Sequence, residues 1–494
     1  MKTNRKILIC TIILFTFIAA CKPQPDVASL EGPPASNAEP DPPLLPAEEP
    51  PAEEPPPART SDEIFGSVAD GTIPVIISHG GAPCDIDAVV YFTEHPQVDL
   101  IGMVLSRGEF HPENAVDDWP RFVLDVLGSQ GTQFGLGSNA AMDANPHDFP
   151  DSWRPGADNF WNLPLPTGTT EFEMHDGHQL IIDLVNSSPE KVTIIAMASM
   201  IDLALALQDD PGIIDNIAHV VIMGGAFTVV GNLNDAPEPS TNISAEWNMY
   251  IDATAAKYVF DSGVPVSIVP LDAIQYFVTK RDIARISAIN DPQVQYVEDN
   301  WKAQMSWGSN AFLIWDTITA VAVTNPEIFH WVVDGVDVIT EPGDYLGQTV
   351  PLNDGTQHIR YAPSADYQAI MGMLYNTYAG NDAFAQSMVD DPITSLEGRW
   401  EGDTAAFHIV FDLAPECKLG MICGTFEIPN FSLSGDITIV ELSGSKYEIK
   451  AINLSTGFHS TAAYEYLQVL PDGTLQYFTQ GQDGSISEAV LVKQ

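Results

Sequence analysis

The sequence predicts an open, doubly wound α/β sheet with mostly parallel strands, followed by a small all-β barrel or sandwich. Three observations predict this architecture. Between residues 70 and 385, short apolar runs alternate with helical patterns. After Pro392 the pattern changes to short alternating segments that are separated by turn signals such as Pro471-Asp472-Gly473. Before residue 63, a long stretch lacks the apolar residues that a folded core requires.

The first 21 residues predict a lipoprotein signal peptide. Basic residues at positions 2, 5 and 6 precede the apolar run Ile7 to Ile18, which is too short to span a membrane. The sequence Ile18-Ala19-Ala20-Cys21 resembles a bacterial lipobox, which implies cleavage before Cys21 and lipidation of its thiol. The alternative is ordinary secretory cleavage with an incidental cysteine. We favour a lipid-anchored, extracytoplasmic protein of the bacterial cell envelope.

Residues 22–62 predict a disordered linker. They are dominated by Pro, Ala and Glu, as in PPLLPAEEPPAEEPPPA, and contain almost no aromatic or β-branched residues. Such a segment cannot bury enough apolar surface to offset the entropy lost on ordering. With a lipid at Cys21, it would act as a spacer between the membrane and the folded part of the chain.

The charge of the chain excludes several classes of partner. Asp and Glu total 67, Lys and Arg total 20, and the formal net charge is −47. A surface that binds nucleic acid or anionic lipid needs clustered basic residues, and the sequence contains no basic run after residue 6. Nucleic acid is therefore not an expected partner. The acidic excess is compatible with attraction of divalent cations, although charge alone specifies no site.

Residues 63–390 are expected to form the α/β domain. The expected strands are residues 75–78, 98–106, 192–199, 219–225 and 264–272. The expected helices are residues 85–94, 115–127, 177–186, 201–208, 253–261 and 365–378. Each strand is a short apolar run that ends in small or polar residues, which is typical of buried parallel strands. In such sheets the ligands gather at the carboxyl ends of the strands.

Residues 391–494 are expected to form the all-β domain. Cys417 and Cys423 lie six residues apart in it, and in an exported chain this spacing favours a local disulfide over two free thiols. Cys84 is then left unpaired. The domain contains no evident metal-binding cluster or nucleophile, so a binding or spacer role is the default expectation.

A series of motifs in residues 70–385 resembles the inosine–uridine-preferring nucleoside hydrolase family. In chain order they are PVII, HPQVDLIGMVLS, MASMIDLALAL, VIMGGAF, GNLN, AEWNMYIDATAA, VFDSGVPVSIVPLD and IWDTITAVAVTNPEIF. The resemblance implies a Ca²⁺-dependent N-ribohydrolase. In that family a calcium ion at the strand ends holds the ribose hydroxyls and a water, and a carboxylate removes a proton from the water that attacks C1′.

The loop after the first strand departs from the pattern of the family. The family's loop reads Asp-x-Asp-x-x-x-Asp-Asp, and its four aspartates fall on Ser78, Gly80, Cys84 and Asp85. Three of the four carboxylates are therefore missing. Gly80 stands where the resemblance places the water-activating base, so the sequence predicts a divergent member with a depleted aspartate loop.

His79 and Asp87 are the nearby candidates for a replacement. His79 can accept a proton, but at a strand end it should face away from Ser78 and Gly80. Asp87 lies two residues beyond Asp85 on a helix, a rotation of about 200°, and should point away from the site. A solvated surface acid or a charge in the first helix turn is the favoured interpretation of Asp87, and a shift of two residues in the loop is the alternative that would bring it into the site.

The resemblance places the remaining metal ligands on two further positions. Asp316, in the motif Ile-Trp-Asp-Thr, matches a distant calcium-binding aspartate. Ile201 falls where the family supplies a backbone carbonyl oxygen. With Asp85, these residues are the expected ligands of a weakly held Ca²⁺, and Asp85, Asp316 and His79 are the candidate catalytic residues.

The expected substrate contacts come from four polar residues and one aromatic residue. Glu246 and Asn248 match a pair that hydrogen-bonds the ribose hydroxyls, and Asn232 matches a further sugar contact. Glu109 stands where the family carries Asn or Asp beside the diol. Trp315 resembles the tryptophan that stacks on the base in the purine-preferring branch, and packing is an equal explanation for it. Trp153 and Trp161 lie in the polar insertion 137–172 and are expected mainly to pack that loop.

The sequence therefore predicts a divergent calcium-dependent N-ribohydrolase that cleaves the N-glycosidic bond of purine nucleosides to free base and ribose. The alternative is a non-catalytic lipoprotein on the same fold that binds a nucleoside or ribose, or that acts as a surface interaction protein. The sequence leaves the oligomeric state open.

Overall fold

The computed structural model describes residues 64–65, 71–143, 147–236, 240–307, 311–381, 384, 393–455, 457–459, 464–481 and 484–494. The signal peptide, lipidation site and linker that we expect before residue 63 lie outside these ranges, and so does the expected domain boundary near residue 390. Within the ranges, no helix combines the length and the apolar character that a membrane span requires.

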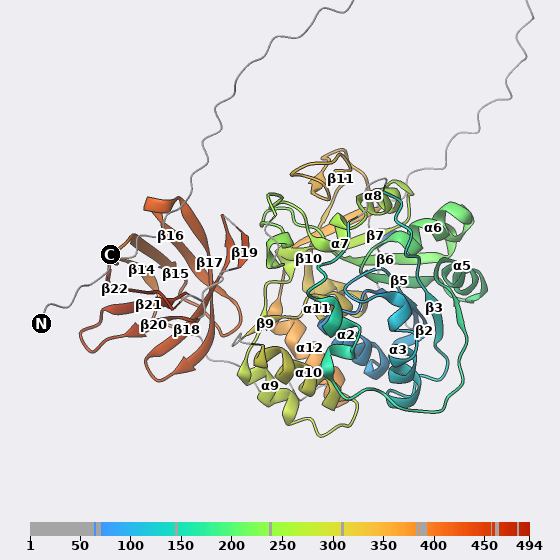
Figure 1. Ribbon diagram of the computed structural model, residues 1–494, viewed down its shortest axis with the longest axis horizontal. Helices are drawn as coiled ribbons and strands as arrows, with labels where there is room; N and C mark the ends of the chain where they lie inside the picture. Colours follow the sequence, from blue (N-terminus) through green and yellow to red (C-terminus); the bar gives the residue numbers. More distant parts are fainter. Residues whose placement is uncertain are drawn as a thin grey trace, which may run out of the picture. The chain divides into compact units, whose positions relative to one another are not determined.

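A nine-stranded sheet forms the centre of the α/β region (Figure 1). In spatial order its strands are β10 (Phe329–Val333), β13 (Ile359–Ala365), β7 (Val266–Val269), β6 (Ile217–Met223), β5 (Val192–Met197), β1 (Ile73–His79), β2 (Val98–Leu105), β3 (Gln133–Leu136) and β4 (Met174–Asp176). Only the β10–β13 pair is antiparallel. The predicted open, mostly parallel sheet is confirmed.

The strand order reverses between β1 and β5, and this reversal positions the functional site. From β1 the chain continues outward through β2, β3 and β4, and then returns to β5 on the other side of β1. Loops that leave the carboxyl ends of β1 and β5 therefore diverge to opposite faces of the sheet. The crevice between such loops is the usual ligand site of an open α/β sheet.

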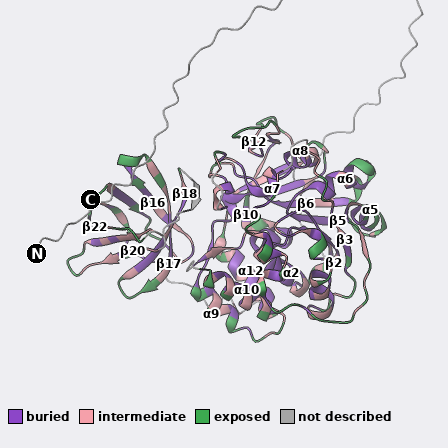
Figure 2. Ribbon diagram, in the orientation of Figure 1, coloured by how far each residue is buried: buried purple, intermediate pink, exposed green. Residues whose placement is uncertain are grey.

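Helices cover both faces of this sheet, as a doubly wound fold requires. The helices of one core are α2 (Pro83–Glu94), α10 (Val294–Ser306), α11 (Trp315–Thr324) and α12 (Tyr367–Ala379). The helices of the other core are α5 (Gly177–Ser187), α6 (Ile201–Asp209) and α8 (Ala253–Asp261). Every residue of β5 is buried between the two cores (Figure 2). The helix expected at 115–127 is instead a short α-helix, Asp118–Arg121, followed by a π-turn, Phe122–Val126.

A closed antiparallel barrel of eight strands follows. In order around the barrel they are β17 (Leu433–Ser443), β16 (Ile422–Ile428), β15 (His408–Leu413), β14 (Gly398–Asp403), β22 (Ile486–Lys493), β21 (Leu475–Gln480), β20 (Tyr464–Val469) and β18 (Lys446–Leu454). Pairing of β17 with β18 closes the barrel, and β19 (Gly457–His459) adds to β18. Inward side chains such as Phe411, Ile439 and Leu467 form its core. Of the predicted alternatives, barrel or sandwich, the structure selects the barrel.

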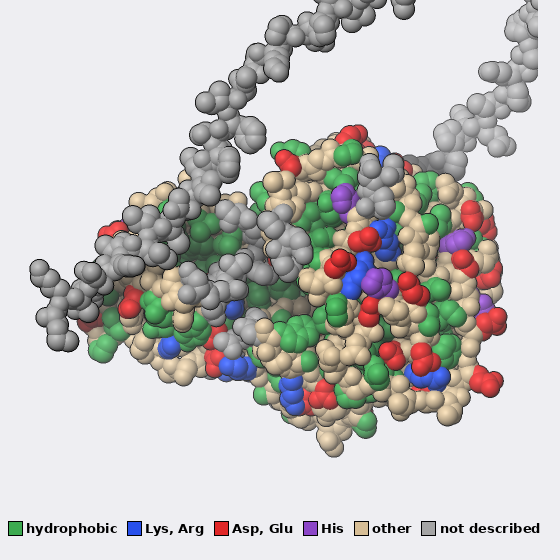
Figure 3. Space-filling model, viewed as in Figure 1, with side chains coloured by type: hydrophobic (Ala, Val, Ile, Leu, Met, Phe, Trp, Pro, Cys, Tyr) green, Lys and Arg blue, Asp and Glu red, His purple; other side chains and the backbone are tan. Residues whose placement is uncertain are grey.

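The acidic side chains, which outnumber the basic ones by 67 to 20 in the sequence, are spread over the visible face rather than gathered into one patch (Figure 3). A dispersed negative surface keeps a protein soluble without forming a specific docking site. The dispersed surface charge of the described residues therefore marks no functional site on this face.

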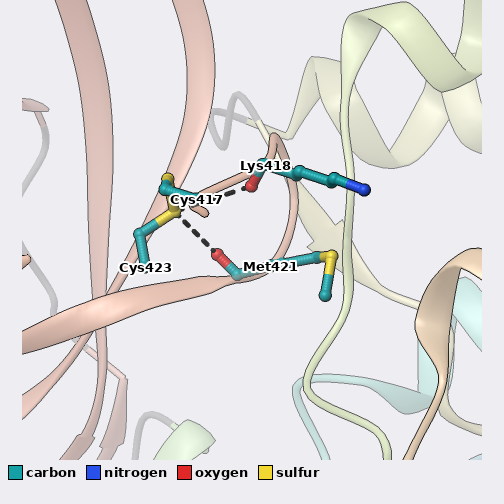
Figure 4. The surroundings of a disulfide bond; sticks show 4 residues. All are labelled: Cys417, Lys418, Met421 and Cys423. Carbon is teal, nitrogen blue, oxygen red and sulfur yellow. Dashed lines mark hydrogen bonds between the residues drawn. A yellow bond between two sulfur atoms is a disulfide. The ribbon is translucent and has the colours of Figure 1, made fainter. Parts of the chain in front are cut away.

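Cys417 and Cys423 form a disulfide at the turn that leads into β16 (Figure 4). Cys84 is the free cysteine among the described residues, and it is buried. Replacing both Cys417 and Cys423 with serine should destabilise the barrel by about 2 kcal/mol, because the closed loop is short and restricts the unfolded chain only modestly. Calorimetry of wild type and of the double serine variant measures this difference, and an unchanged melting profile would contradict it.

Candidate active site

A pocket opens at the carboxyl ends of β1, β5 and β6. Its polar lining consists of Glu109, Asn232, Glu246, Asn248 and Asp316. Its apolar lining includes Phe149, Trp153, Met197, Met223, Trp247 and Trp315. The fold thus brings together all five residues that the sequence predicts as substrate contacts, together with one of the two predicted carboxylate ligands.

Asp85 lies in the first turn of α2, directly behind this pocket. Pro83 begins the helix, and the backbone N–H of Ala82 donates to Asp85 Oδ2 over 2.7 Å. The side chain is fully buried, and Asp85 Oδ1 has no hydrogen-bond partner among the described residues. Burial raises the pKa of Asp85, because a buried carboxylate loses its hydration.

Asp316 meets the same helix turn from a distant part of the sequence. It lies in the first turn of α11 and is 3 % exposed. Its Oδ2 accepts the thiol of Cys84 over 2.8 Å, while Oδ1 has no partner within the described part of the chain. Burial and the neighbouring Asp85 raise the pKa of Asp316. The structure therefore places the two predicted acids together at one site.

Cys84 occupies a position where the resemblance expects a carboxylate, and its chemistry is different. Burial, Asp316 and Asp85 all raise the pKa of the thiol. A neutral thiol donates a hydrogen bond and is a poor ligand for a hard cation such as Ca²⁺. Cys84 therefore supports Asp316 rather than holding an ion.

The residues present fit part of a calcium site. Asp85 Oδ1 and Asp316 Oδ1 are buried, unpartnered carboxylate oxygens, which are the ligands that Ca²⁺ prefers. The described residues contain no group of three or more His, Cys, Asp or Glu side chains placed to hold a metal. Because Ca²⁺ takes six to eight oxygens, most of its ligands would have to be water or substrate oxygens.

Ile201 and His79 are not among the residues that line the pocket. Ile201 is the first residue of α6, where a carbonyl oxygen accepts the N–H four residues later and points along the helix. His79 is fully buried against Trp119, with Nδ1 3.3 Å from Asp85 Oδ2. Burial lowers the pKa of His79 to about 3, so the ring is neutral. His79 positions Asp85, and nothing places it near a substrate water.

Gly80 allows no side chain in its present position. A Cβ atom on Gly80 would lie 2.7 Å from the Cα of Gly108 and 3.0 Å from the Cβ of Ala198. The backbone N–H of Phe110 donates to the carbonyl of Gly80 over 2.9 Å and fixes this approach. The loop after β2 thus occupies space that a carboxylate at position 80 would need.

Glu246 is held rigidly at the pocket wall. It caps the short helix α7 (Trp247–Tyr250), and its carboxylate accepts backbone N–H groups of Gly225, Asn248 and Met249 over 3.0–3.3 Å. Burial raises the pKa of Glu246 to about 7, although these N–H groups act in the opposite direction. A fixed carboxylate with spare lone pairs is suited to accept sugar hydroxyls.

The raised pKa of Glu246 makes the stability of the protein depend on pH. A carboxyl whose pKa rises on folding stabilises the folded state below its unfolded pKa, and this contribution is lost as pH rises through about 7. We expect Glu246→Gln to remove roughly 3 kcal/mol of the decline in unfolding free energy between pH 4.5 and pH 8. Urea unfolding at several pH values measures the two slopes. Parallel slopes for the two proteins would contradict the expectation.

Asn248 and Asn232 complete the polar wall. Asn248 Nδ2 donates to the carbonyl of Met223 over 3.0 Å, which leaves its carboxamide oxygen on the opposite side. Asn232 Oδ1 accepts the backbone N–H of Trp247 over 3.0 Å. Asn232 Nδ2 is buried without a partner among the described residues. The Asn232 side chain also lies near enough to the Glu246 carboxylate to act against the rise of its pKa, so the two side chains belong to one polar wall.

The insertion over residues 137–172 covers one side of the pocket. Phe149 stacks on Trp247 with ring centroids 5.3 Å apart, and Trp153 contacts the same indole edge-on. Trp161 does not line the pocket; its Nε1 donates to the carbonyl of Gly81 over 2.7 Å and supports the loop after β1. The predicted packing role therefore suits Trp161, whereas Trp153 lies at the pocket.

Two buried networks beside the site were missed from the sequence. Ser78 contacts Ser106, whose hydroxyl donates to Asp202 over 2.7 Å. Asp87 is fully buried rather than solvated, and it accepts hydrogen bonds from Asn300 and Trp301. The prediction that Asp87 is a surface acid is therefore wrong, although it does point away from the pocket. Its partners lie more than 200 positions along the chain, so no local pattern reveals them.

Comparisons with known proteins find related sequences. The family model described as inosine-uridine preferring nucleoside hydrolase matches residues 75–373. Probable uridine nucleosidase 1 of Oryza sativa subsp. japonica is 26% identical over 261 residues, which cover 52% of this chain and 77% of that protein. The pyrimidine-specific ribonucleoside hydrolase RihA of Escherichia coli O1:K1 is 27% identical over 330 residues, covering 64% and 96% respectively.

Solved structures share the same fold. A purine-preferring ribonucleoside hydrolase from Gardnerella vaginalis superposes with a TM-score of 0.55 at 23% identity, covering 64% of this chain and 99% of that chain. An inosine-uridine preferring nucleoside hydrolase from Bacillus anthracis gives 0.55 at 22% identity, covering 62% and 99%. The family match ends before the barrel, at residue 373.

Proposed function

Since this chain belongs to the inosine-uridine preferring nucleoside hydrolase family, we propose that it is an N-ribohydrolase that cleaves nucleosides to free base and ribose. The observation that carries this proposal is the convergence of Glu246, Asn248, Asn232 and Asp316 on one pocket at the strand ends. Their donors and acceptors suit a vicinal diol, because each sugar hydroxyl both donates and accepts.

The aromatic wall supports a preference for purines. Trp315, Trp153 and Trp247 line the pocket, and a bicyclic base offers more surface for stacking than a pyrimidine does. The names of the relatives point both ways, since RihA is called pyrimidine-specific and the Gardnerella enzyme purine-preferring. The support for purine preference is therefore the set of tryptophan side chains that line the pocket.

The preference is tested with Trp315→Ala. Stacking of a base on an aromatic ring contributes about 1–3 kcal/mol, so KM for inosine should rise about tenfold, and KM for uridine should rise less. Trp307→Ala is the matched control, because Trp307 is exposed and lies outside the pocket lining. Equal effects of Trp315→Ala on both substrates would remove the support for purine preference.

Calcium is the cofactor that we propose, held weakly by Asp85 and Asp316. When bound, the ion would supply positive charge that orients the sugar hydroxyls and polarises water. A site with two carboxylates should bind in the range of about 10⁻⁴–10⁻³ M, where extracellular calcium modules bind. The N-terminal sequence further supports a lipid-anchored location in the bacterial cell envelope, as proposed from Cys21 and its flanking residues.

A non-catalytic role remains the second candidate, and one observation favours it. Position 80, where the resemblance places the water-activating base, is glycine and is packed too closely for a side chain. A protein with this pocket would still bind a nucleoside or ribose without cleaving it. The same scaffold would then serve as a binding or surface interaction lipoprotein.

Release of ribose distinguishes the two candidates. The purified protein is incubated with inosine or uridine and millimolar Ca²⁺, and reducing sugar is measured over time. Release above the buffer control supports the hydrolase. A thermal shift with inosine but no release supports the binding protein, and the absence of both results would contradict each proposal.

A further inference from the structure

The loop after β2 packs against Gly80 and brings Glu109 close to that position. Gly80 and Gly108 touch through their backbones: a Cβ on Gly108 would lie 2.2 Å from the Cα of Gly80. Neither residue can carry a side chain without moving the other loop. The backbone nitrogen of Glu109 would lie 3.4 Å from a Cβ on Gly80. The backbone of Glu109 therefore passes within 4 Å of the point where a side chain at position 80 would begin.

Glu109 sends its side chain into the same pocket. It lines the pocket with Gly80, Gly108 and Asp316. It lies in the negative field of Asp85 and Asp316, and burial together with that field raises its pKa, while Arg154 acts in the opposite direction. A raised pKa makes the ionised carboxylate a stronger base than a solvated one, so Glu109 accepts a proton readily at a pH where it is ionised.

Each of the other carboxylates around the pocket has at least one oxygen that accepts a hydrogen bond from the protein, and the free Oδ1 atoms of Asp85 and Asp316 are the proposed cation ligands. Glu246 accepts three backbone N–H groups, and Asp316 Oδ2 accepts the thiol of Cys84. Asp85 lies behind the pocket and accepts the N–H of Ala82. Among the described residues, the Glu109 carboxylate makes no hydrogen bond or ion pair, so it is free to contact a water or substrate.

We propose that Glu109 is the general base of this site, in place of the carboxylate that is absent at position 80. This inference rests on the proposed hydrolase function. A Glu109 carboxylate oxygen takes one proton from water, the water oxygen bonds to C1′, and the C1′–N bond breaks with its electron pair going to the base. The departing nucleobase takes a proton from solvent, and Glu109 later returns its proton to solvent. Nucleoside and water thus give free nucleobase and ribose.

The test compares wild type with Glu109→Gln and Glu109→Ala. We expect Glu109→Gln to lower kcat by about 10²- to 10⁴-fold, the usual contribution of a general base, while the thermal shift with inosine persists. Added formate should restore part of the activity of Glu109→Ala, because a small carboxylate can enter the vacated space and accept the proton. Glu113→Gln is the matched control, since Glu113 is a nearby acid outside the pocket lining.

The outcomes distinguish a failure of the role proposed for Glu109 from a failure of the proposed hydrolase function. Turnover by wild type, loss in Glu109→Gln and rescue by formate together support the inference. Turnover by Glu109→Gln within about threefold of wild type overturns it, and so does a loss that formate does not rescue in Glu109→Ala. If wild type itself releases no ribose, the proposed function fails first, and no reaction remains for Glu109 to serve.

Discussion

Asp316→Asn is expected to reduce hydrolysis of inosine on the order of 100-fold or more while leaving the fold at least as stable as wild type. Asp316 lines the pocket, and it and the neighbouring Asp85 are buried acids that each have one oxygen without a hydrogen-bond partner among the described residues. Removing its charge removes half of the carboxylate ligands that support a cation and the field around the reacting sugar. Ribose release and calorimetry on the same samples measure the two effects.

The expected stability follows from the raised pKa of Asp316. Burial and the nearby Asp85 make its ionised form costly, so a neutral asparagine of the same shape should relieve repulsion. Loss of activity without loss of stability is typical of a residue kept for function. Asp87→Asn is the matched control, because Asp87 is equally buried but does not line the pocket. An active Asp316→Asn protein would remove this residue from the proposed site.

Gly80→Asp should destabilise the protein by about 1–3 kcal/mol, the usual cost of overpacking, rather than restore an efficient enzyme. The new Cβ would lie 2.7 Å from backbone, the Cα of Gly108, and backbone cannot rotate aside as a flexible side chain can. Displacing the Gly108 loop would also move Glu109 from the pocket. We therefore expect turnover to fall together with the melting temperature.

Gly131→Asp is the control for this substitution. A Cβ on Gly131 would meet nothing within 4 Å, so the same chemical change should be nearly neutral there. Denaturation and ribose release are measured on both variants. A Gly80→Asp protein that is as stable as wild type and releases ribose faster would show that the loop containing Gly108 moves at little cost. That result would contradict the role proposed for Glu109.

Much of the fold was predictable because its signals are local. The continuous apolar runs of β1, β5 and β6 predict buried parallel strands, and all three occur in the sheet. The π-turn at Phe122–Val126 was not predictable, since its residues show an ordinary helical pattern. Closure of the barrel depends on the pairing of β17 with β18, and short alternating segments do not distinguish a barrel from a sandwich.

The site was predictable where its residues are neighbours in the sequence. Glu246 and Asn248 flank Trp247, and all three line the pocket. The contact between Gly80 and Gly108 joins two separate loops, so the sequence assigned Glu109 to the sugar without revealing that it lies beside position 80. Tertiary proximity of this kind follows only from the register of β1 with β2.

A crystal structure of Glu109→Gln with inosine tests the central claim most directly, because this variant should bind substrate without consuming it. The account predicts the ribose hydroxyls within hydrogen-bond distance of Glu246, Asn248 and Asn232, the base against Trp315, and C1′ facing residue 109. A nucleoside bound outside this pocket, or with its base at Asp316 and its sugar toward solvent, would contradict it.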